Sequence, residues 1–511
     1  MTPTPENEVE TDSAQPGKRR GRPLLPALFF LYVAALFGAT AALQAGLFER
    51  DGYFHARFAW MVFDRGLSRS FPWTQMSTWR LQFCDKEFLY HLAMLPFARL
   101  GQDPILGARI FGVLLSIAVL VTFYAVLRAQ RVRFPAIFTA LTLATGGLFI
   151  ARLGMLRSHV LSMLLLTLGL HFLLQRRWRA LLILGFIYAW CYTVPFVLLL
   201  TAVPFVLGSR LAGPRLDLRL PLAAGAGSVL GLAIHPYTPL TLETLLTYVQ
   251  VFRLGLQGAA TSGFELGNEL YPYSLPVFWD IYPLLLILVA ALPPVLVLAR
   301  KRLEPGTLGL AAAALFWFTM TAASPRFAEY SVLLVAATWA LLVRDLWPWL
   351  EARPLWQRPG LRATAAGLAL ATLAGFHARS LAFYQVYQTQ AAPPRFFTGA
   401  CAWMARTLAP GATVLNLYWD DFPELFYDGY RQTFIWGLDP TYTIRADASR
   451  ARVLEDFRRG RLALDAPRLK ALFQADYLVL RSTRAGRYPA LNFPPFREVY
   501  RDDSAVVFAL D

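Results

Sequence analysis

Long apolar stretches recur along the chain from Pro23 to Leu381. Most are roughly 17 to 25 residues long, which is the length that an α-helix needs to cross a bilayer. No comparable stretch follows Leu381. The pattern predicts a polytopic α-helical membrane protein, with spans at 24–46, 104–127, 134–151, 158–175, 180–208, 219–235, 279–299, 306–323, 327–343 and 363–381.

Basic residues between these stretches predict the topology, because cytoplasmic loops of membrane proteins are enriched in Lys and Arg. The arginine clusters between Arg128 and Arg362 can all be cytoplasmic only if 180–208 crosses twice. Pro195 and Pro204 favour a break there. The result is about eleven spans. The outer side then holds the loops 47–103 and 236–278, the short turn Arg152–Arg157 and everything after 382.

The two ends of the chain differ from this apolar part. Residues 1–22 are rich in Pro, Glu, Thr and Gly and end in a basic cluster, which predicts a disordered cytoplasmic tail. From about 395 the pattern changes to that of a soluble α/β domain on the outer side. We therefore expect a tail (1–22), a transmembrane domain (23–394) and an α/β domain (395–511). The α/β segments are helix-like 396–408 and 447–460 and strand-like 412–417, 477–480 and 505–509.

The composition supports a membrane protein and affects how the net positive charge is interpreted. Of 511 residues, 56% are hydrophobic and 16% are charged, against about 25% charged residues in soluble domains. The net charge of +16 lies mostly in short loops, so we expect it to set topology and expect no nucleic acid partner. The excess of arginine over lysine favours a GC-rich bacterium, and hence its inner membrane with the C-terminal domain in the periplasm or outside. Cys84 and Cys401 lie in outer segments and could form a disulfide.

The first candidate site directly follows the first span. Glu49 and Asp51 lie at the membrane boundary, and the apolar residues after them recur at near-helical spacing. This spacing predicts an amphipathic helix in the membrane interface. An acid at its start could coordinate a divalent cation or accept a hydrogen bond from an incoming nucleophile. A solvated loop start would explain the same acids.

Outer arginines are the second signal, because they break the bias toward cytoplasmic positive charge. Arg152 and Arg157 lie in a turn too short to leave the membrane surface, so they need an anion. That anion is either a lipid headgroup phosphate or a lipid-linked phosphate substrate. Arg326 opens a late span and could pair with Glu329 or face a diphosphate. His159 is either a ligand or acid of such a site or a buried structural histidine.

Other outer segments could contribute further groups. Glu265 and Glu269 lie in a glycine-containing stretch that suits a mobile loop lending a carboxylate to a site, or an ordinary polar loop. Trp419 and Asp420 follow a predicted strand, where an exposed tryptophan is unusual and favours ligand recognition. The run Asp85–His91 stays open, since acids stabilise the first turn of a helix whatever else they do.

Together these features resemble the GT-C superfamily of membrane glycosyltransferases, and most of all the catalytic subunit of oligosaccharyltransferases. Members of that family have many spans, an acid in the first outer loop, a glutamate in a later outer loop and a C-terminal soluble domain on the same side. The run Asp51–Tyr53 is similar to the family's first acidic motif. Glu265 or Glu269 is similar to its loop glutamate, and Arg326 to the arginine that binds the donor's diphosphate.

The resemblance also has a gap. The run Tyr418–Phe422 is similar to the Trp-Trp-Asp-Tyr-Gly motif that recognises the acceptor peptide, although it lacks the final Tyr-Gly. The second acidic motif, which should supply metal-binding carboxylates, is missing, because Arg157–His159 stands in its place. The resemblance therefore supports the superfamily more than asparagine glycosylation.

The resemblance implies a glycosyltransferase that moves a sugar from a polyprenyl-phosphate or polyprenyl-diphosphate carrier to a glycan, lipid or protein acceptor on the outer face. Asp51 would orient or deprotonate the attacking hydroxyl, or hold Mg²⁺ or Mn²⁺. Arg326, Arg157 and Arg152 would stabilise charge on the departing phosphate. The alternative, favoured by the missing motif, is a non-catalytic or transport protein that binds lipid-linked sugars.

Overall fold

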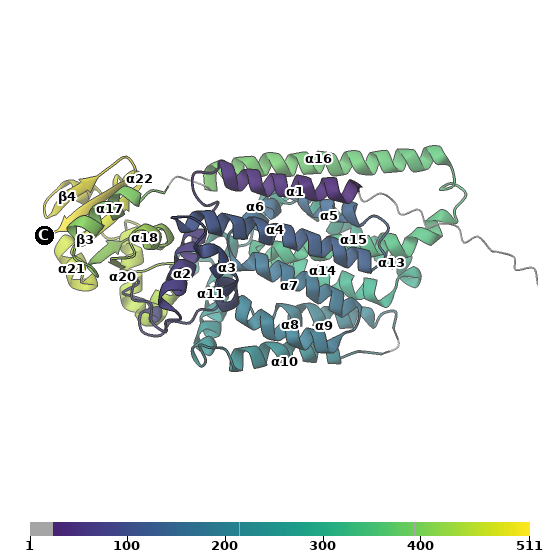
Figure 1. Cartoon of the computed structure of the whole chain (residues 1–511), viewed down its shortest axis with the longest axis horizontal. Coiled ribbons are helices and arrows are strands. Elements are labelled where there is room, and N and C mark those ends of the chain that lie inside the picture. The colour runs from purple at the N-terminus through teal and green to yellow at the C-terminus, as the bar shows by residue number, and fades with distance from the viewer. Residues whose placement is uncertain (1–23, 214, 392–394) are drawn as a thin grey trace, which may run out of the picture.

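The computed structural model describes residues 24–213, 215–391 and 395–511. The molecule is elongated: a bundle of helices forms most of its length, and a smaller part with the sheet lies at one end (Figure 1). The predicted tail 1–22 lies outside the described residues. Within the described residues, the apolar stretches of the sequence all form helices. These are α1 (Leu24–Leu43), α4 (Pro104–Ala129), α5 (Pro135–Ala144), α6 (Gly147–Gly154), α7 (Ser158–Leu174), α8 (Trp178–Cys191), α9 (Val197–Ser209), α10 (Arg219–Ala233), α13 (Pro283–Ala299), α14 (Pro305–Ala323), α15 (Ala328–Glu351) and α16 (Pro359–Ala391).

Six of the helices in the described part of the chain are long and apolar enough to cross a membrane. Helices α5 and α6 together could form a seventh span, bent by 97° at the break between them. The segment 180–208 divides into α8 and α9, which supports the predicted break. Because α7 to α10 are shorter than a full span, the count of eleven crossings stays a prediction.

Small residues let some of these helices approach closely. A Cβ on Gly227 of α10 would lie 2.0 Å from the carbonyl oxygen of Leu182 on α8, and one on Gly185 would lie 2.5 Å from the carbonyl oxygen of Ala224. Close backbone packing of this kind is the main source of helix association in lipid, where apolar surface alone gives no driving force. Helix α15 lies in the interior of the bundle, since nearly all of its residues from Ala328 to Leu342 are buried.

The two loops predicted to be outer, 47–103 and 236–278, are largely helical and keep the name outer loops below. The segment after α1 contains α2 (Asp51–Arg65), η1 (Thr78–Arg80) and α3 (Phe88–Ala98). Helix α2 forms where the spacing predicted it, but protein covers the aromatic side chains of its first two turns, Tyr53, Phe54 and Phe58, while Phe63 near its end is 56% exposed. Phe54 stacks on Phe58 and packs against Phe426 of the C-terminal part. The later outer loop contains α11 (Leu240–Ser262), η2 (Asn268–Leu270) and α12 (Leu275–Ile281), and the turns η3 (Arg300–Arg302) and η4 (Pro325–Phe327) flank α14.

The C-terminal part is built on a five-stranded sheet with the strand order β2-β1-β3-β5-β4. Strand β1 pairs in parallel with β2 and β3, while β5 pairs antiparallel with β3 and β4. The predicted strands and helices all form there; the domain boundaries stay a prediction. The elements are α17 (Thr398–Thr407), β1 (Thr413–Asn416), η5 (Trp419–Asp421), α18 (Phe422–Asp428), β2 (Thr433–Phe434), α19 (Pro440–Ala446), α20 (Ala448–Arg458), α21 (Ala466–Phe473), β3 (Tyr477–Arg481), α22 (Ser482–Ala485), η6 (Pro489–Asn492), β4 (Phe496–Arg501) and β5 (Ala505–Leu510).

The first outer loop and the C-terminal part are joined by backbone as well as side chains. The Gln75 N–H donates to the Phe434 carbonyl over 2.7 Å, and the Phe434 N–H donates to the Trp73 carbonyl over 2.9 Å. The loop thus extends the edge of the sheet beside β2, in the manner of strand addition. Cys84 and Cys401 are both free and buried in the same apolar cluster, so the structure does not contain the disulfide that their positions allowed.

Candidate functional site

A cavity of about 520 Å³ lies where the helical bundle, the outer loops and the C-terminal part meet. Its wall brings together residues from α2, α6, η2, η4 and η5, which are far apart in the sequence. Of the predicted site residues, Glu265 is the one that does not line it. Glu265 instead pairs with Arg458 of α20 at 2.6 Å. The predicted residues on the wall are Asp51, Arg152, Arg157, His159, Glu269, Arg326, Trp419 and Asp420.

Glu269 is the hub of the arginines in this cavity. Its carboxylate lies 2.7 Å from Arg152, 3.5 Å from Arg157 and 3.8 Å from Arg326. Burial alone would raise the pKa of Glu269, but the three guanidinium groups hold it well below its usual range. The Ser324 hydroxyl donates to the Glu269 carbonyl over 3.0 Å and so fastens this loop to η4. The Glu269 side chain and backbone thus both contact neighbouring elements, and the choice between a mobile loop and an ordinary polar loop stays a prediction.

Arg152 and Arg326 differ from each other in their partners. Arg152 is 4% exposed and also pairs with the fully buried Glu329, so the anions that it contacts are carboxylates of the protein itself. Because Glu329 takes Arg152 as its partner, the Arg326–Glu329 pair that the spacing allowed is not the one formed. Arg326 keeps free hydrogen-bonding capacity, since its buried Nε has no partner among the described residues.

Asp51 is the first residue of α2 and is held by two groups. Arg157 donates to its carboxylate, while its own N–H donates to the Glu49 carboxylate over 3.0 Å. Arg157 also lies 4.0 Å from Glu49. Burial, together with the charge of Asp51, raises the pKa of the Glu49 carboxyl to about 8. The acidic pair of the sequence is thus one carboxylate facing an arginine and one carboxyl that holds its proton to a higher pH than an exposed glutamate does.

The surroundings of Asp51 do not fit a divalent cation. Mg²⁺ and Mn²⁺ prefer several oxygen ligands, whereas the space in front of Asp51 and Glu49 is taken by the Arg157 guanidinium. Glu269, the other cavity carboxylate near Asp51, is likewise directed at arginines. A cation ligated by Asp51 stays a prediction from sequence, and no chemical step below depends on it.

His159, another predicted residue on the cavity wall, has a structural partner. His159 is buried and donates from Nε2 to the Arg152 carbonyl over 2.8 Å, which agrees with a structural histidine that stabilises the turn.

Lys86 was not among the predicted site residues, but it also lines the cavity and contacts the Tyr248 ring at 4.6 Å. Its position between two acids in the run Asp85–Glu87 was the available signal.

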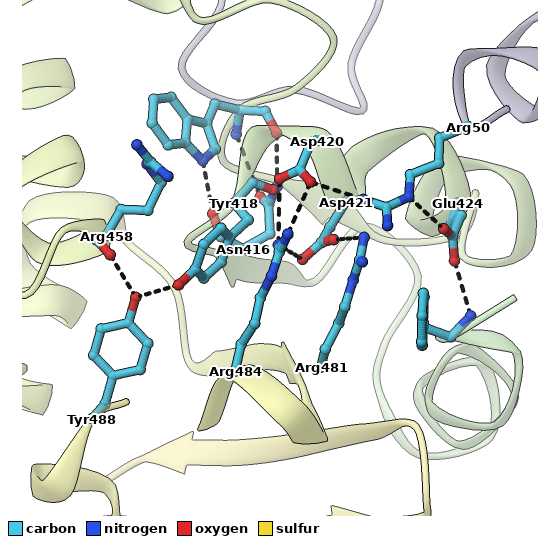
Figure 2. A network of polar contacts seen from close by, with 12 residues as sticks. Arg50, Asn416, Tyr418, Asp420, Asp421, Glu424, Arg458, Arg481, Arg484 and Tyr488 are labelled. Carbon is cyan, nitrogen blue, oxygen red and sulfur yellow. Dashed lines mark hydrogen bonds and ion pairs between the residues drawn. The ribbon is translucent and has the colours of Figure 1, made fainter. Parts of the chain in front are cut away.

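Trp419 and Asp420 are half-buried rather than exposed, because η5 lies against the first outer loop. Figure 2 shows Arg50 reaching Asp420 from one side and Arg484 from the other, at 2.8 and 2.9 Å. Arg481 pairs with the neighbouring Asp421, and burial raises the pKa of that carboxyl to about 6. Arg50 directly precedes Asp51 in the sequence. The ion pairs around Asp420 therefore hold the C-terminal part beside Asp51.

Neither a protein-family model nor a curated protein sequence matches the chain. Solved structures do match. The apo oligosaccharyltransferase from Archaeoglobus fulgidus has a TM-score of 0.59 at 13% identity, over 90% of this chain and 70% of that one. Its complex with zinc and sulfate gives 0.58 at 14% identity, over 94% and 73%.

Two further structures complete the comparison. ArnT from Cupriavidus metallidurans bound to undecaprenyl phosphate gives a TM-score of 0.55 at 15% identity, over 96% of this chain and 99% of that one. The arabinofuranosyltransferase AftD from Mycobacteria gives 0.55 at 14% identity, over 94% and 40%. All are GT-C glycosyltransferases. At such identities the likeness concerns the architecture, and it shows that the chain has the fold of the GT-C membrane glycosyltransferases.

Proposed function

We propose that this chain is a membrane glycosyltransferase that transfers a sugar from a polyprenyl-phosphate or polyprenyl-diphosphate carrier to an acceptor on the outer face of a membrane. The observation that carries the proposal is the convergence of Arg152, Arg157 and Arg326 on one cavity beside the Asp51 carboxylate. Such a set of cations next to a carboxylate suits a reaction in which negative charge leaves and a proton is removed. ArnT, which shares the fold, binds undecaprenyl phosphate.

Arg326 is the residue that we assign to the carrier phosphate. Its contact with Glu269 is the loosest of the three, at 3.8 Å, and its buried Nε has no partner among the described residues. An anionic phosphate could pair with the accessible part of this guanidinium, whose side chain is 21% exposed, without breaking a tight pair. Arg152 is held between Glu269 and Glu329, so we infer that it positions Glu269 rather than contacting the donor.

Asp51 is the residue that we assign to the acceptor. The acceptor hydroxyl gives its proton to the Asp51 carboxylate while its oxygen forms a bond to the anomeric carbon of the sugar. The bond from that carbon to the phosphate oxygen breaks, and the electron pair leaves with the polyprenyl phosphate or diphosphate. Arg326 and Arg157 stabilise the charge that develops there, a term worth several kcal/mol in comparable sites, roughly 3 per donor. Trp419, on the C-terminal wall, contacts the acceptor.

Asp51→Ala tests this assignment against the alternative of a non-catalytic or transport protein. The purified protein in nanodiscs receives a panel of radiolabelled sugars on undecaprenyl phosphate, with membrane extract as the acceptor source. We expect the wild type to consume one donor, and Asp51→Ala to consume it at least about 100-fold more slowly. Binding of undecaprenyl phosphate should be retained in the variant. Asp64→Ala, an exposed acid at the far end of α2, is the matched control.

Equal transfer by Asp51→Ala and the wild type would overturn the catalytic role of Asp51. Carrier binding without consumption of any donor by the wild type would instead favour the transport alternative. Thermal unfolding of each variant shows whether a loss of transfer reflects a loss of folding.

A further inference from the structure

A cluster of two histidines and one glutamate adjoins the cavity but takes no part in the proposed transfer. His55 lies on the second turn of α2, Glu87 directly precedes α3, and His91 lies one turn into α3. One ligand atom from each of the three lies within 4.8 Å of the others. All three residues are buried. Two imidazoles and a carboxylate converging from separate elements are the donors that borderline metal ions prefer.

We propose that His55, Glu87 and His91 form a binding site for a divalent transition-metal ion, with zinc the best fit. His55 Nδ1 lies 2.9 Å from His91 Nε2 and 3.9 Å from Glu87 Oε2. Ligand atoms around tetrahedral zinc are about 3.3 Å apart, given metal–nitrogen distances near 2.0 Å. The two observed separations lie on either side of that value, so small side-chain rotations would close the site.

Neighbouring groups orient two of the three ligands as they do in known metal sites. His91 Nδ1 lies 2.9 Å from both oxygens of the Asp85 carboxylate, which directs Nε2 toward the centre of the cluster. Ser158 donates to Glu87 Oε1 over 2.6 Å, leaving Oε2 toward His55. A carboxylate behind a ligating histidine fixes its tautomer and raises its basicity. The cluster therefore has the outer shell of a metal site as well as its ligands.

The site would be open on one side. His55 and Glu87 both line the cavity, so a fourth ligand could come from water or from a molecule bound there. Two histidines and a glutamate with one free position are a donor set of catalytic zinc sites. The place differs from Asp51, where the surroundings do not fit a cation. The inference does not depend on glycosyl transfer, because metal binding is measured without turnover.

A metal-free relay is the competing explanation of the same contacts. In that case Asp85, His91 and His55 form a chain of hydrogen bonds, and the 2.9 Å separation of the two imidazoles is an ordinary hydrogen bond. The metal site predicts one bound ion per chain with imidazole ligands. The relay predicts no stoichiometric binding at these residues.

The full-length protein, purified in detergent with a tag free of histidine and treated with EDTA, is incubated with zinc and passed through gel filtration. We expect about one zinc per chain by mass spectrometry in the wild type, and less than about one tenth of that in Glu87→Gln and His91→Gln. Asp85→Asn should bind zinc about 10- to 100-fold more weakly. His171→Gln, which changes a histidine on α7 away from the cluster, should bind as the wild type does.

A wild type without stoichiometric zinc, or a Glu87→Gln variant with the zinc affinity of the wild type, would overturn the proposal. X-ray absorption of the zinc-loaded wild type provides a test that needs no variant to fold. We expect two imidazole ligands at about 2.0 Å. A zinc shell without imidazole would equally contradict the site.

Discussion

At the scale of single residues, the cavity holds its cations by opposing them with carboxylates. Arg152, Arg157 and Arg326 all approach Glu269; Arg152 has one further acidic partner, and Arg157 has two. Breaking a buried ion pair by removing one partner costs about 3–5 kcal/mol, because the other charge stays buried. The Arg152–Glu329 pair, whose side chains are 4% and 0% exposed, is therefore too tightly held to reorganise on binding. Arg326 makes the loosest contact with Glu269 and so can turn to a ligand.

The protonation of Glu49 makes the free energy of unfolding depend on pH. Because burial raises the pKa of its carboxyl to about 8, the folded state keeps a proton that the unfolded state releases above its ordinary pKa of 4.5. The contribution of Glu49 to the free energy of unfolding therefore falls as the pH rises from about 4.5 to about 8, and is constant above that. Glu49→Gln removes this loss and keeps an oxygen that can accept the Asp51 N–H.

We expect Glu49→Gln to unfold at nearly the wild-type temperature at pH 5 and a few degrees higher at pH 8. A gain of about 1–2 kcal/mol corresponds to a shift of that size. Thermal unfolding in detergent at both pH values measures it. Glu351→Gln, which removes a half-exposed acid at the end of α15, should show no such pH-dependent difference. A Glu49→Gln variant without a gain at pH 8 would show that the carboxyl is already ionised.

At the scale of elements, close helix packing holds the bundle together, and backbone pairing joins the first outer loop to the C-terminal sheet. Helices α8 and α10 approach through glycines, and the first outer loop adds to the sheet edge beside β2. The ion network around Asp420 then ties η5 to the residue before α2 (Figure 2). Asp51 is thus positioned by elements from both parts of the molecule.

Gly227→Ala tests the packing of α8 on α10. The new Cβ would lie 2.0 Å from the Leu182 carbonyl oxygen, so the two backbones must separate. We expect a destabilisation of about 1–3 kcal/mol, seen as a lower unfolding temperature in detergent. Gly225→Ala on the same helix is the matched control, because its nearest neighbour is a Leu199 side-chain atom at 3.4 Å. Equal unfolding temperatures for the two variants would contradict the close packing.

At the scale of the whole molecule, the sequence predicted the parts better than their contacts. The apolar stretches placed the helices, and the order of acids, arginines and α/β segments indicated the GT-C fold. The predicted site residues also converge, apart from Glu265. Charged side chains next to apolar spans avoid the hydrocarbon and gather at polar sites between helices and loops. The position of a charged residue relative to the predicted spans was therefore enough to select it as a site residue.

Ion pairs between residues that are far apart in the sequence could not be predicted. The pairing of Arg152 with Glu329 joins residues 177 positions apart, and that of Arg50 with Asp420 joins residues 370 apart. Local spacing allowed the nearer Arg326–Glu329 pair, but in the folded chain Glu329 pairs with Arg152 instead. The sequence left the run Asp85–His91 open but did not bring His55 together with Glu87 and His91, because the two segments meet only through tertiary packing.

The affinity for undecaprenyl phosphate tests the central claim most directly, because the claim requires the arginine cavity to bind a carrier phosphate. Native mass spectrometry or fluorescence titration compares the wild type with Arg326→Gln. Arg379→Gln is the control, as it removes a half-exposed arginine on α16 with only a loose partner, Asp280. We predict binding at least about 10-fold weaker in Arg326→Gln, the loss of one charged hydrogen bond, and unchanged binding in Arg379→Gln. Equal affinities in all three proteins would contradict a carrier phosphate at this site.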